Sequence, residues 1–337
     1  VGCREAIGPG KARRHADRIS AMADRGVKRQ FCEDKVAAQT EFQESLQWEK
    51  EERSVPSDFE FYDCYALLPK IEIPLGSHAV IPDAAEAEGN VADRALSITI
   101  RMPDRSENMH GDFLHTERLG EVLWASGHVL AALLATVGLE MREGGTHFNA
   151  GRIGTPRWER PPRVLELGCG LAVPSMVAAC LGAAVVATDI PEAGVRTQKC
   201  IDQNCTQWAA TPGSLSFEGL MWQDSAADYG PLADGPWDLV LAADCLYDES
   251  QHTQFCRVLA RALGVGTPRD PDRHSPMALL SFQQRVPGKE ARFIKLRLPE
   301  VGLEVVRQWP LQEIPGLSEA HLRYISVLEV RPRMLSN

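Results

Sequence analysis

The chain has 337 residues, 44% hydrophobic and 24% charged, with 27 glycines and 22 prolines. This composition is typical of a globular protein and excludes collagen-like, wholly disordered and coiled-coil classes for the chain as a whole. The formal net charge of −10 disfavours general binding to nucleic acid and is compatible with a basic protein partner.

The nine cysteines are an odd number without a Cys-x-x-Cys pair, and several lie inside apolar runs. We therefore expect reduced thiols and no metal site. No apolar stretch is long enough to span a membrane, and the charged N-terminal segment lacks a signal-peptide core. These features predict a cytoplasmic protein, with a nuclear location left open, and we expect a monomer without a membrane partner.

Three regions follow one another along the chain. Residues 1–55 are a charged arm rich in helix formers but without a sustained apolar stripe, so we expect a frayed helix or disorder. Residues 56–95 show strand-like alternation interrupted by prolines, which predicts a segment that packs on the core. Residues 96–331 are expected to form the compact domain, beginning with a half-buried strand at 96–101.

Within the compact domain, a long amphipathic helix is predicted over residues 120–137, and the Gly- and Pro-rich stretch 142–162 is predicted to be a surface insertion. Apolar runs then alternate with helical stretches. The predicted strands are 163–167, 184–189, 215–220, 237–244, 277–284, 303–309 and 323–330, and the predicted helices are 171–181, 192–205, 252–263 and 289–299. The last two strands have a short link, 310–321, and should pair antiparallel at the edge.

This alternation predicts an α/β fold: a Rossmann-like, seven-stranded, mostly parallel sheet with one antiparallel edge strand and helices on both faces.

The strongest local signal is a glycine-containing turn after the strand at 163–167, made by Gly168, Cys169 and Gly170. Such a turn either lets the backbone approach a ligand or is an ordinary tight turn. The third glycine of a dinucleotide fingerprint is replaced by Val173, which disfavours a pyrophosphate. Glu166 gives the form E-x-G-x-G, which suits a ligand without phosphate that carries a cationic amino acid portion, such as S-adenosylmethionine.

Three other residues are candidates for contacts with such a ligand. Asp189 ends the second strand, nineteen residues beyond Gly170, and either binds both hydroxyls of a ribose or caps the next helix. Trp222 follows the third strand and either stacks on an adenine or is a large core residue. Trp124, near the start of the helix at 120–137, is open to the same two interpretations.

The fourth strand ends in Ala242 and Ala243, whose small side chains leave room for a ligand, followed by Asp244 and Tyr247. Asp244 is either a receptor that holds and orients an amine, with Tyr247 as a wall of its channel, or a carboxylate satisfied within the fold.

Together the segments ELGCG, TDIP, the Trp after the third strand and AADCLYD resemble the class I seven-strand S-adenosylmethionine-dependent methyltransferases, specifically the lysine methyltransferase group called methyltransferase family 16. The resemblance covers about residues 96–331. It implies Asp244 and Tyr247, which match the group's D-x-x-Y/F motif, as the catalytic residues. The cofactor contacts that we then expect are Trp124, Glu166, Gly168, Cys169, Gly170, Asp189, Trp222 and Ala243.

Within the group, the chain looks most like the proteins that methylate the N-terminus and a neighbouring lysine of elongation factor 1-alpha, some of which are labelled nicotinamide N-methyltransferase-like. The resemblance implies methyl transfer to an amine nitrogen of a protein substrate, such as this or another basic protein. A small-molecule N-methyltransferase is one alternative, and an inactive cofactor-binding scaffold or another Rossmann-like protein is the other. The charged arm, residues 59–82 and the insertion depart from the family, in segments of the kind that contact substrate.

Overall fold

The structure is a computed structural model that describes residues 70–74, 97–102, 123–139, 161–223, 230–267, 275–284 and 288–333. All of them belong to one compact unit, residues 53–337. The arm predicted at 1–55 and residues 142–160 of the predicted insertion lie outside the described residues, and these predictions stay predictions.

The first two strands form a small sheet of their own. β1 (Lys70–Pro74) and β2 (Ser97–Arg101) pair antiparallel, and their isoleucines are buried in the same core cluster as helix α3 (Ala125–Val137). The side chain of Asn204 accepts a hydrogen bond from the backbone N–H of Arg101 (2.7 Å) and donates one to its carbonyl (2.9 Å). The strand predicted at 96–101 therefore exists, but it docks on the main sheet's helices and does not join that sheet.

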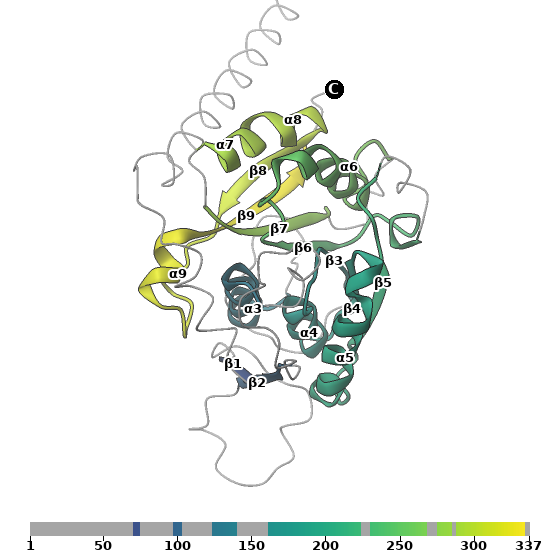
Figure 1. Cartoon of the computed structure of the whole chain (residues 1–337), viewed down its shortest axis with the longest axis vertical. Helices are drawn as coiled ribbons and strands as arrows, with labels where there is room; N and C mark the ends of the chain where they lie inside the picture. Colours follow the sequence, from purple (N-terminus) through teal and green to yellow (C-terminus); the bar gives the residue numbers. More distant parts are fainter. Residues whose placement is uncertain are drawn as a thin grey trace, which may run out of the picture. The chain divides into compact units, whose positions relative to one another are not determined.

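The main sheet has seven strands in the order β5-β4-β3-β6-β7-β9-β8 (Figure 1). Their bounds are β3 Arg163–Leu167, β4 Ala184–Asp189, β5 Ser214–Gly219, β6 Leu239–Ala243, β7 Met277–Gln283, β8 Leu303–Gln308 and β9 Ile325–Pro332. β3 to β7 are parallel, whereas β9 pairs antiparallel with both β7 and β8. The predicted fold class and the antiparallel pairing at the edge are confirmed, with β9 lying between β7 and the outermost strand β8.

Helices cover both faces of this sheet (Figure 1). One face carries α3, α4 (Val173–Cys180) and α5 (Gly194–Asn204), and the other carries α6 (His252–Ala262), α7 (Lys289–Arg292), a π-helical turn (Phe293–Arg297) and α8 (Leu298–Glu300). Single 3-10 turns (Pro191–Ala193, Cys205–Gln207, Gly230–Leu232 and Glu249–Gln251) lie in the connections. No helix in the described part of the chain combines the length and the apolar character needed to cross a membrane.

Helix α3 is not the amphipathic helix that the sequence predicts. It begins at Ala125, and every residue in it except Thr136 is buried. The helix contacts β6, β7 and β9 of the main sheet, α4 beside it and β1 of the small sheet, so no side of it is left for water. The prediction of one apolar face was wrong because the small sheet covers the second side.

The link before the last strand contains a helix that the sequence analysis missed, α9 (Glu319–Tyr324). Ser318 and His321 form a capping box at its start, in which the backbone N–H of Ser318 donates to His321 Nδ1 (2.9 Å). The imidazole of His321 packs edge-on against that of His128 on α3, with ring centroids 5.5 Å apart. α9 therefore also contacts α3, through this pair of imidazoles.

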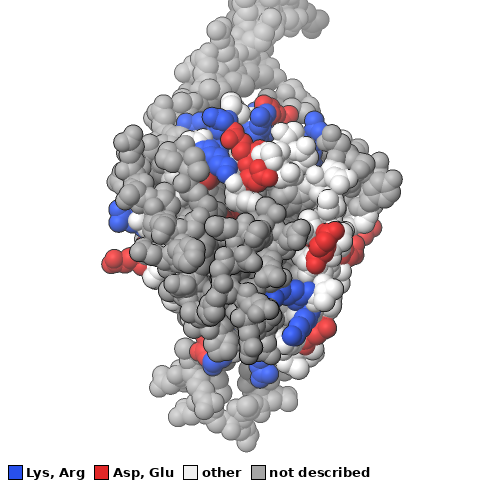
Figure 2. All heavy atoms as spheres, in the orientation of Figure 1, with Lys and Arg blue, Asp and Glu red and all other residues white. Residues whose placement is uncertain are grey.

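Charged residues of both signs are interspersed on the described part of the face in Figure 2. Several form ion pairs, among them Lys70 with Glu72, Arg292 with Glu249 and Arg297 with Glu300. Each of these partners is about half exposed, so such pairs contribute little to stability.

Candidate active site

The turn after β3 has an unusual backbone. Gly168 (φ 65°), Gly170 (φ 50°) and Ala172 (φ 56°) all adopt left-handed conformations, which favour glycine. A Cβ atom on Gly168 would lie 2.8 Å from the Cys245 sulfur and 3.3 Å from the indole of Trp222. Gly168 therefore lies where the segments that follow β3, β5 and β6 meet, and a side chain there would separate them.

The amide groups of this turn are already used within the protein. The N–H of Gly170 donates to Asp189 Oδ2 (2.8 Å), and the N–H of Ser175 in the first turn of α4 donates to Glu166 Oε2 (3.1 Å). Pro174, between them, has no N–H to offer. A pyrophosphate needs such amides, so the geometry fits the phosphate-free ligand that the sequence predicts better than a dinucleotide.

Glu166 lies inside the fold. It is 1% exposed, and besides the Ser175 N–H it accepts a short hydrogen bond from the Ser175 hydroxyl. Burial raises the pKa of Glu166 to about 8, although both hydrogen bonds from Ser175 oppose the shift. The structure thus places this carboxyl group beneath the turn, where it joins β3 to α4, and not on an exposed wall that a ligand would touch.

Asp189 ends β4 and is partly exposed. Its two carboxylate oxygens accept one backbone hydrogen bond each, from Gly170 (2.8 Å) and from Ile190 (2.7 Å), and it caps neither the 3-10 turn at Pro191–Ala193 nor α5. Burial raises the pKa of Asp189, with the two backbone hydrogen bonds acting against it. A carboxylate has about four lone-pair positions, so each oxygen keeps one with which to accept a ribose hydroxyl.

A residue that the sequence analysis did not single out holds this turn from the other side. Thr197 on α5 is buried, and its hydroxyl donates to the carbonyl of Gly170 at 2.6 Å. The peptide groups of Gly170 are thereby fixed at both ends, the N–H by Asp189 and the carbonyl by Thr197. Nothing in the sequence indicates this role, because it depends on how α5 faces the turn.

The two predicted tryptophans lie at the borders of this region. Trp222 is half-buried after β5, and its ring packs at 5.0 Å, tilted, against Phe255 of α6. Trp124 is half-buried at the N-cap of α3, where its carbonyl accepts the N–H of Gly127 (2.9 Å). Both indoles are partly exposed, and that of Trp222 also packs against the core.

Ala243, the last residue of β6, lies where α3 approaches the end of that strand. A Cβ built on Gly127 would lie 4.0 Å from the Ala243 Cβ, so the first turn of α3 closely approaches this strand end. Cys245 follows two residues later, and its thiol donates to the carbonyl of Leu167 (3.2 Å). Burial raises the pKa of the Cys245 thiol, and likewise that of Cys169, well above the usual range, so both behave as neutral packing groups.

Asp244 and Tyr247 follow β6, as predicted. Asp244 is buried in a left-handed conformation (φ 61°), and its backbone N–H donates to the carbonyl of Ser281 on β7 (2.7 Å). A non-glycine residue in this region is held there by its surroundings and is common at functional sites. Tyr247 is 50% exposed, and burial of the remainder raises the pKa of its phenol.

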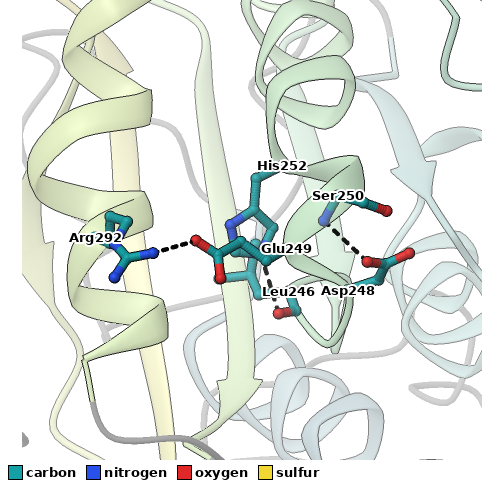
Figure 3. A network of polar contacts seen from close by, with 6 residues as sticks. All are labelled: Leu246, Asp248, Glu249, Ser250, His252 and Arg292. Atoms are coloured by element: carbon teal, nitrogen blue, oxygen red, sulfur yellow. Dashed lines mark hydrogen bonds and ion pairs between the residues drawn. The ribbon is translucent and has the colours of Figure 1, made fainter.

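The loop that carries these two residues is anchored at several points (Figure 3). The Asp248 carboxylate accepts the N–H of Ser250 (2.9 Å), and a ring nitrogen of His252 lies 3.1 Å from the carbonyl of Leu246. Two side chains of α7, which lies on the same face of the sheet as α6, then reach this loop. Arg292 pairs with Glu249 at 2.5 Å. Lys289 donates to the carbonyl of Tyr247. The loop is therefore held against α6 and α7 with its Tyr247 side chain half exposed.

All ten predicted site residues lie at or beside the carboxyl ends of β3 to β6. The sheet order reverses between β3 and β6, which is the switch point where doubly wound sheets bind ligands. Among the residues that the structure describes, no three His, Cys, Asp or Glu side chains form a group that could hold a metal ion.

Residues 111–296, more than half of the chain, match the family model described as lysine methyltransferase, methyltransferase family 16. The chain belongs to this family. The resemblance seen in the sequence is confirmed, and the matched residues include every predicted site residue.

The chain is also similar to several curated fungal proteins named protein N-terminal and lysine N-methyltransferase EFM7. It is 26% identical to the protein of Yarrowia lipolytica over 163 residues, covering 44% of this chain and 54% of that one. It is 32% identical to the protein of Eremothecium gossypii over 126 residues, covering 32% and 46%. The corresponding figures for Emericella nidulans are 30% over 177 residues, covering 43% and 65%. The chain thus spans about half the length of the curated relatives it matches.

Among solved structures, magnesium protoporphyrin IX methyltransferase from Synechocystis PCC 6803 with bound SAM is 21% identical, with 52% of this chain and 71% of that chain covered and a TM-score of 0.34. A TM-score this low supports no inference about the site.

Proposed function

We propose that this protein is an S-adenosylmethionine-dependent methyltransferase that methylates an amine nitrogen of a protein, either a lysine side chain or an N-terminal amine. The observation that carries the proposal is that two half-sites lie together at the switch point between β3 and β6. The first is the turn at Gly170 fixed to Asp189, and the second is the anchored loop with Asp244 and Tyr247. Membership of the lysine methyltransferase family supports the same reaction.

The first half-site suits S-adenosylmethionine. Asp189 offers lone pairs to both ribose hydroxyls, the turn at Gly168 and Gly170 admits a close approach of the backbone, and the partly exposed indoles of Trp124 and Trp222 border the region. When bound, the cofactor supplies a methyl carbon made electrophilic by a sulfonium sulfur, which keeps the bonding electron pair.

The second half-site prepares the acceptor. A lysine amine has a pKa of about 10.4 in water and is protonated at neutral pH, so its lone pair becomes available only once that proton has passed to water. In this proposal Asp244 accepts a hydrogen bond from the amine and fixes its direction. Tyr247 lines the channel and excludes water, which lowers the pKa of the amine by desolvation. No covalent intermediate with the protein is needed, so the site acts by positioning.

The protein substrate is proposed from the relatives, whose names record N-terminal and lysine methylation of proteins. The net charge of −10 suits a basic partner such as elongation factor 1-alpha. We propose that this protein acts on its partner as a monomer in the cytoplasm.

Calorimetric titration with S-adenosylhomocysteine tests the first half-site. The wild-type chain is expected to bind, and Asp189→Ala is expected to weaken binding about a hundredfold, because two hydrogen bonds to a charged acceptor are worth about 3 kcal/mol or more together. Asp202→Ala is the matched control, since Asp202 is an exposed carboxylate on α5. No binding by the wild-type chain would contradict the proposed function.

Radiolabelled methyl transfer to lysate protein, compared with transfer to small amines such as nicotinamide, tests the substrate class. Label in protein that is lost in Asp244→Ala is the expected result. Label in the small amines alone would replace the protein substrate with a small molecule, and full activity of Asp244→Ala would remove the role given to that carboxylate.

A further inference from the structure

Three buried polar side chains near the active site have atoms without a hydrogen-bond partner among the described residues. They are the hydroxyls of Ser126 and Ser281 and the side-chain nitrogen of Gln283. The three residues are 1%, 2% and 2% exposed. Buried polar atoms are nearly always paired, because leaving one unpaired costs about 1–3 kcal/mol. Three such atoms close to one strand end therefore indicate that something else pairs with them.

Ser281 and Gln283 point to one face of the sheet. Side chains alternate along a strand, so these two share a face of β7 with Met277 and Leu279, which lie in the core cluster that contains α3. Ser281 is in register with Ala243 on β6, and its carbonyl accepts the backbone N–H of Asp244 at 2.7 Å. Both side chains are thus beside the end of β6, on the α3 side.

The third residue lies on helix α3, whose first turn approaches the same strand end. Ser126 belongs to its first turn, next to Gly127, which approaches Ala243. The next residue, His128, packs against His321 of α9, and burial lowers the pKa of His128 to about 4. The His128 imidazole is therefore neutral at physiological pH and does not repel an incoming amine.

Ser281 and Gln283 lie away from the first half-site, which is proposed to bind the nucleoside of the cofactor. Asp189 and the turn at Gly170 belong to β3 and β4, on one side of the switch point, whereas Ser281 and Gln283 belong to β7, on the other. In doubly wound sheets the ligand lies across this point. The β7 side, with Asp244 between the two halves, is the part left for the methyl acceptor.

The unpaired atoms also indicate what the acceptor looks like. Serine hydroxyls accept hydrogen bonds from the N–H groups of an amine, but the Gln283 nitrogen is a donor and needs an acceptor such as a carbonyl. An α-amine at the start of a polypeptide has a carbonyl one carbon away. A lysine amine is surrounded by methylene groups and offers none.

We propose that Ser126, Ser281 and Gln283 form an acceptor subsite that binds the first residue of a polypeptide, with Gln283 donating to its carbonyl and thereby favouring α-amines over lysine side chains. This inference rests on the proposed function and adds the residues that select the substrate.

The test compares two pools of short peptides of randomised sequence. One has a free α-amine and no lysine, and the other has an acetylated N-terminus and one lysine. The measured quantity is the ratio of kcat/KM for the first pool to that for the second. Gln283→Met keeps the size of the side chain but removes the donor, and it is expected to lower this ratio about fivefold to tenfold, the worth of one buried hydrogen bond. Gln283→Glu, which replaces the donor by an acceptor, is expected to lower it at least as much.

Gln254→Met is the matched control. Gln254 also has a buried side-chain atom without a partner among the described residues, but it lies on α6, across the sheet, and the ratio is expected to stay at the wild-type value. An unchanged ratio in both Gln283 variants would overturn the inference while leaving the proposed function intact, and so would an equal fall in Gln254→Met. If the wild-type chain methylates neither the pools nor lysate protein, the proposed function fails, and this inference fails with it.

Discussion

The hydrogen bond from Thr197 to Gly170 offers a sharp test of how the turn at Gly170 is held and of its proposed role in cofactor binding. Valine has the shape of threonine without the hydroxyl, so Thr197→Val leaves the Gly170 carbonyl with only the weak thiol donor of Cys169 at 3.9 Å. Such a loss costs about 1–3 kcal/mol. Because the N–H of the same residue is bound to Asp189, we expect the loss to reach the ligand and weaken S-adenosylhomocysteine binding about tenfold, which corresponds to about 1.4 kcal/mol.

Two variants separate this effect from a general loss of stability. Thr197→Ser restores the hydroxyl and is expected to bind S-adenosylhomocysteine within about twofold of wild type. Thr211 lies just before β5, at the end of that strand away from the turn at Gly170. Its hydroxyl donates to the carbonyls of Trp208 (2.9 Å) and Ala179 (3.1 Å). Thr211→Val should therefore lower stability without changing affinity for S-adenosylhomocysteine. Titration calorimetry and urea unfolding measure both quantities. Wild-type affinity in Thr197→Val, or equal weakening by Thr211→Val, would refute the reasoning.

Three other changes have expected outcomes. Glu166 has a pKa of about 8 in the folded protein against 4.5 as its reference, so its neutral form stabilises the fold fully at low pH, and this stabilisation is lost as the pH rises toward 8. Between pH 4.5 and about 8, urea unfolding should show the free energy of unfolding of wild type falling by about 1.4 kcal/mol per pH unit relative to Glu166→Gln. The same pH dependence of stability in both proteins would contradict a buried neutral Glu166. Gly168→Ala should lose about 1–3 kcal/mol of stability, more than Gly266→Ala, which has a similar positive φ but no atom within 4 Å of its Cβ position. A double-mutant cycle on the exposed pair Glu249 and Arg292 should give a coupling of only about 0.2–1 kcal/mol in thermal unfolding, and a larger value would mean that this pair, not Lys289, secures the loop.

The bounds of strands β3 and β4 could be predicted closely from the sequence. β3 and β4 have the bounds expected from sequence, because their apolar runs stop at a turn, at Gly168 with its positive φ in one case and just before Pro191 in the other. The positions of the motif residues followed, since parallel strands place their carboxyl ends at one edge.

Other features depend on contacts that sequence periodicity does not reveal. Helix α3 reads as amphipathic because the chain does not show that β1 and β2 will cover its second side. The short helix α9 is specified by a cap between Ser318 and His321 in a stretch rich in Pro and Gly, where no apolar period can develop. Ser281 and Gln283 look like the polar end of a buried strand, and their relation to Asp244 comes from the pairing of β7 with β6.

The burial of α3 decides what a smaller version of this protein would need. A recombinant fragment cut at the family bounds, 111–296, would lack β1 and β2 on one side of α3 and β8 and β9 beside β7. All seven residues of β7 are buried, so removing β9 would leave a long apolar strand with unpaired backbone groups at a new sheet edge, the kind of edge on which proteins aggregate. The predicted site residues fit within the family bounds, but the folded unit that carries them extends at least from β1 to β9.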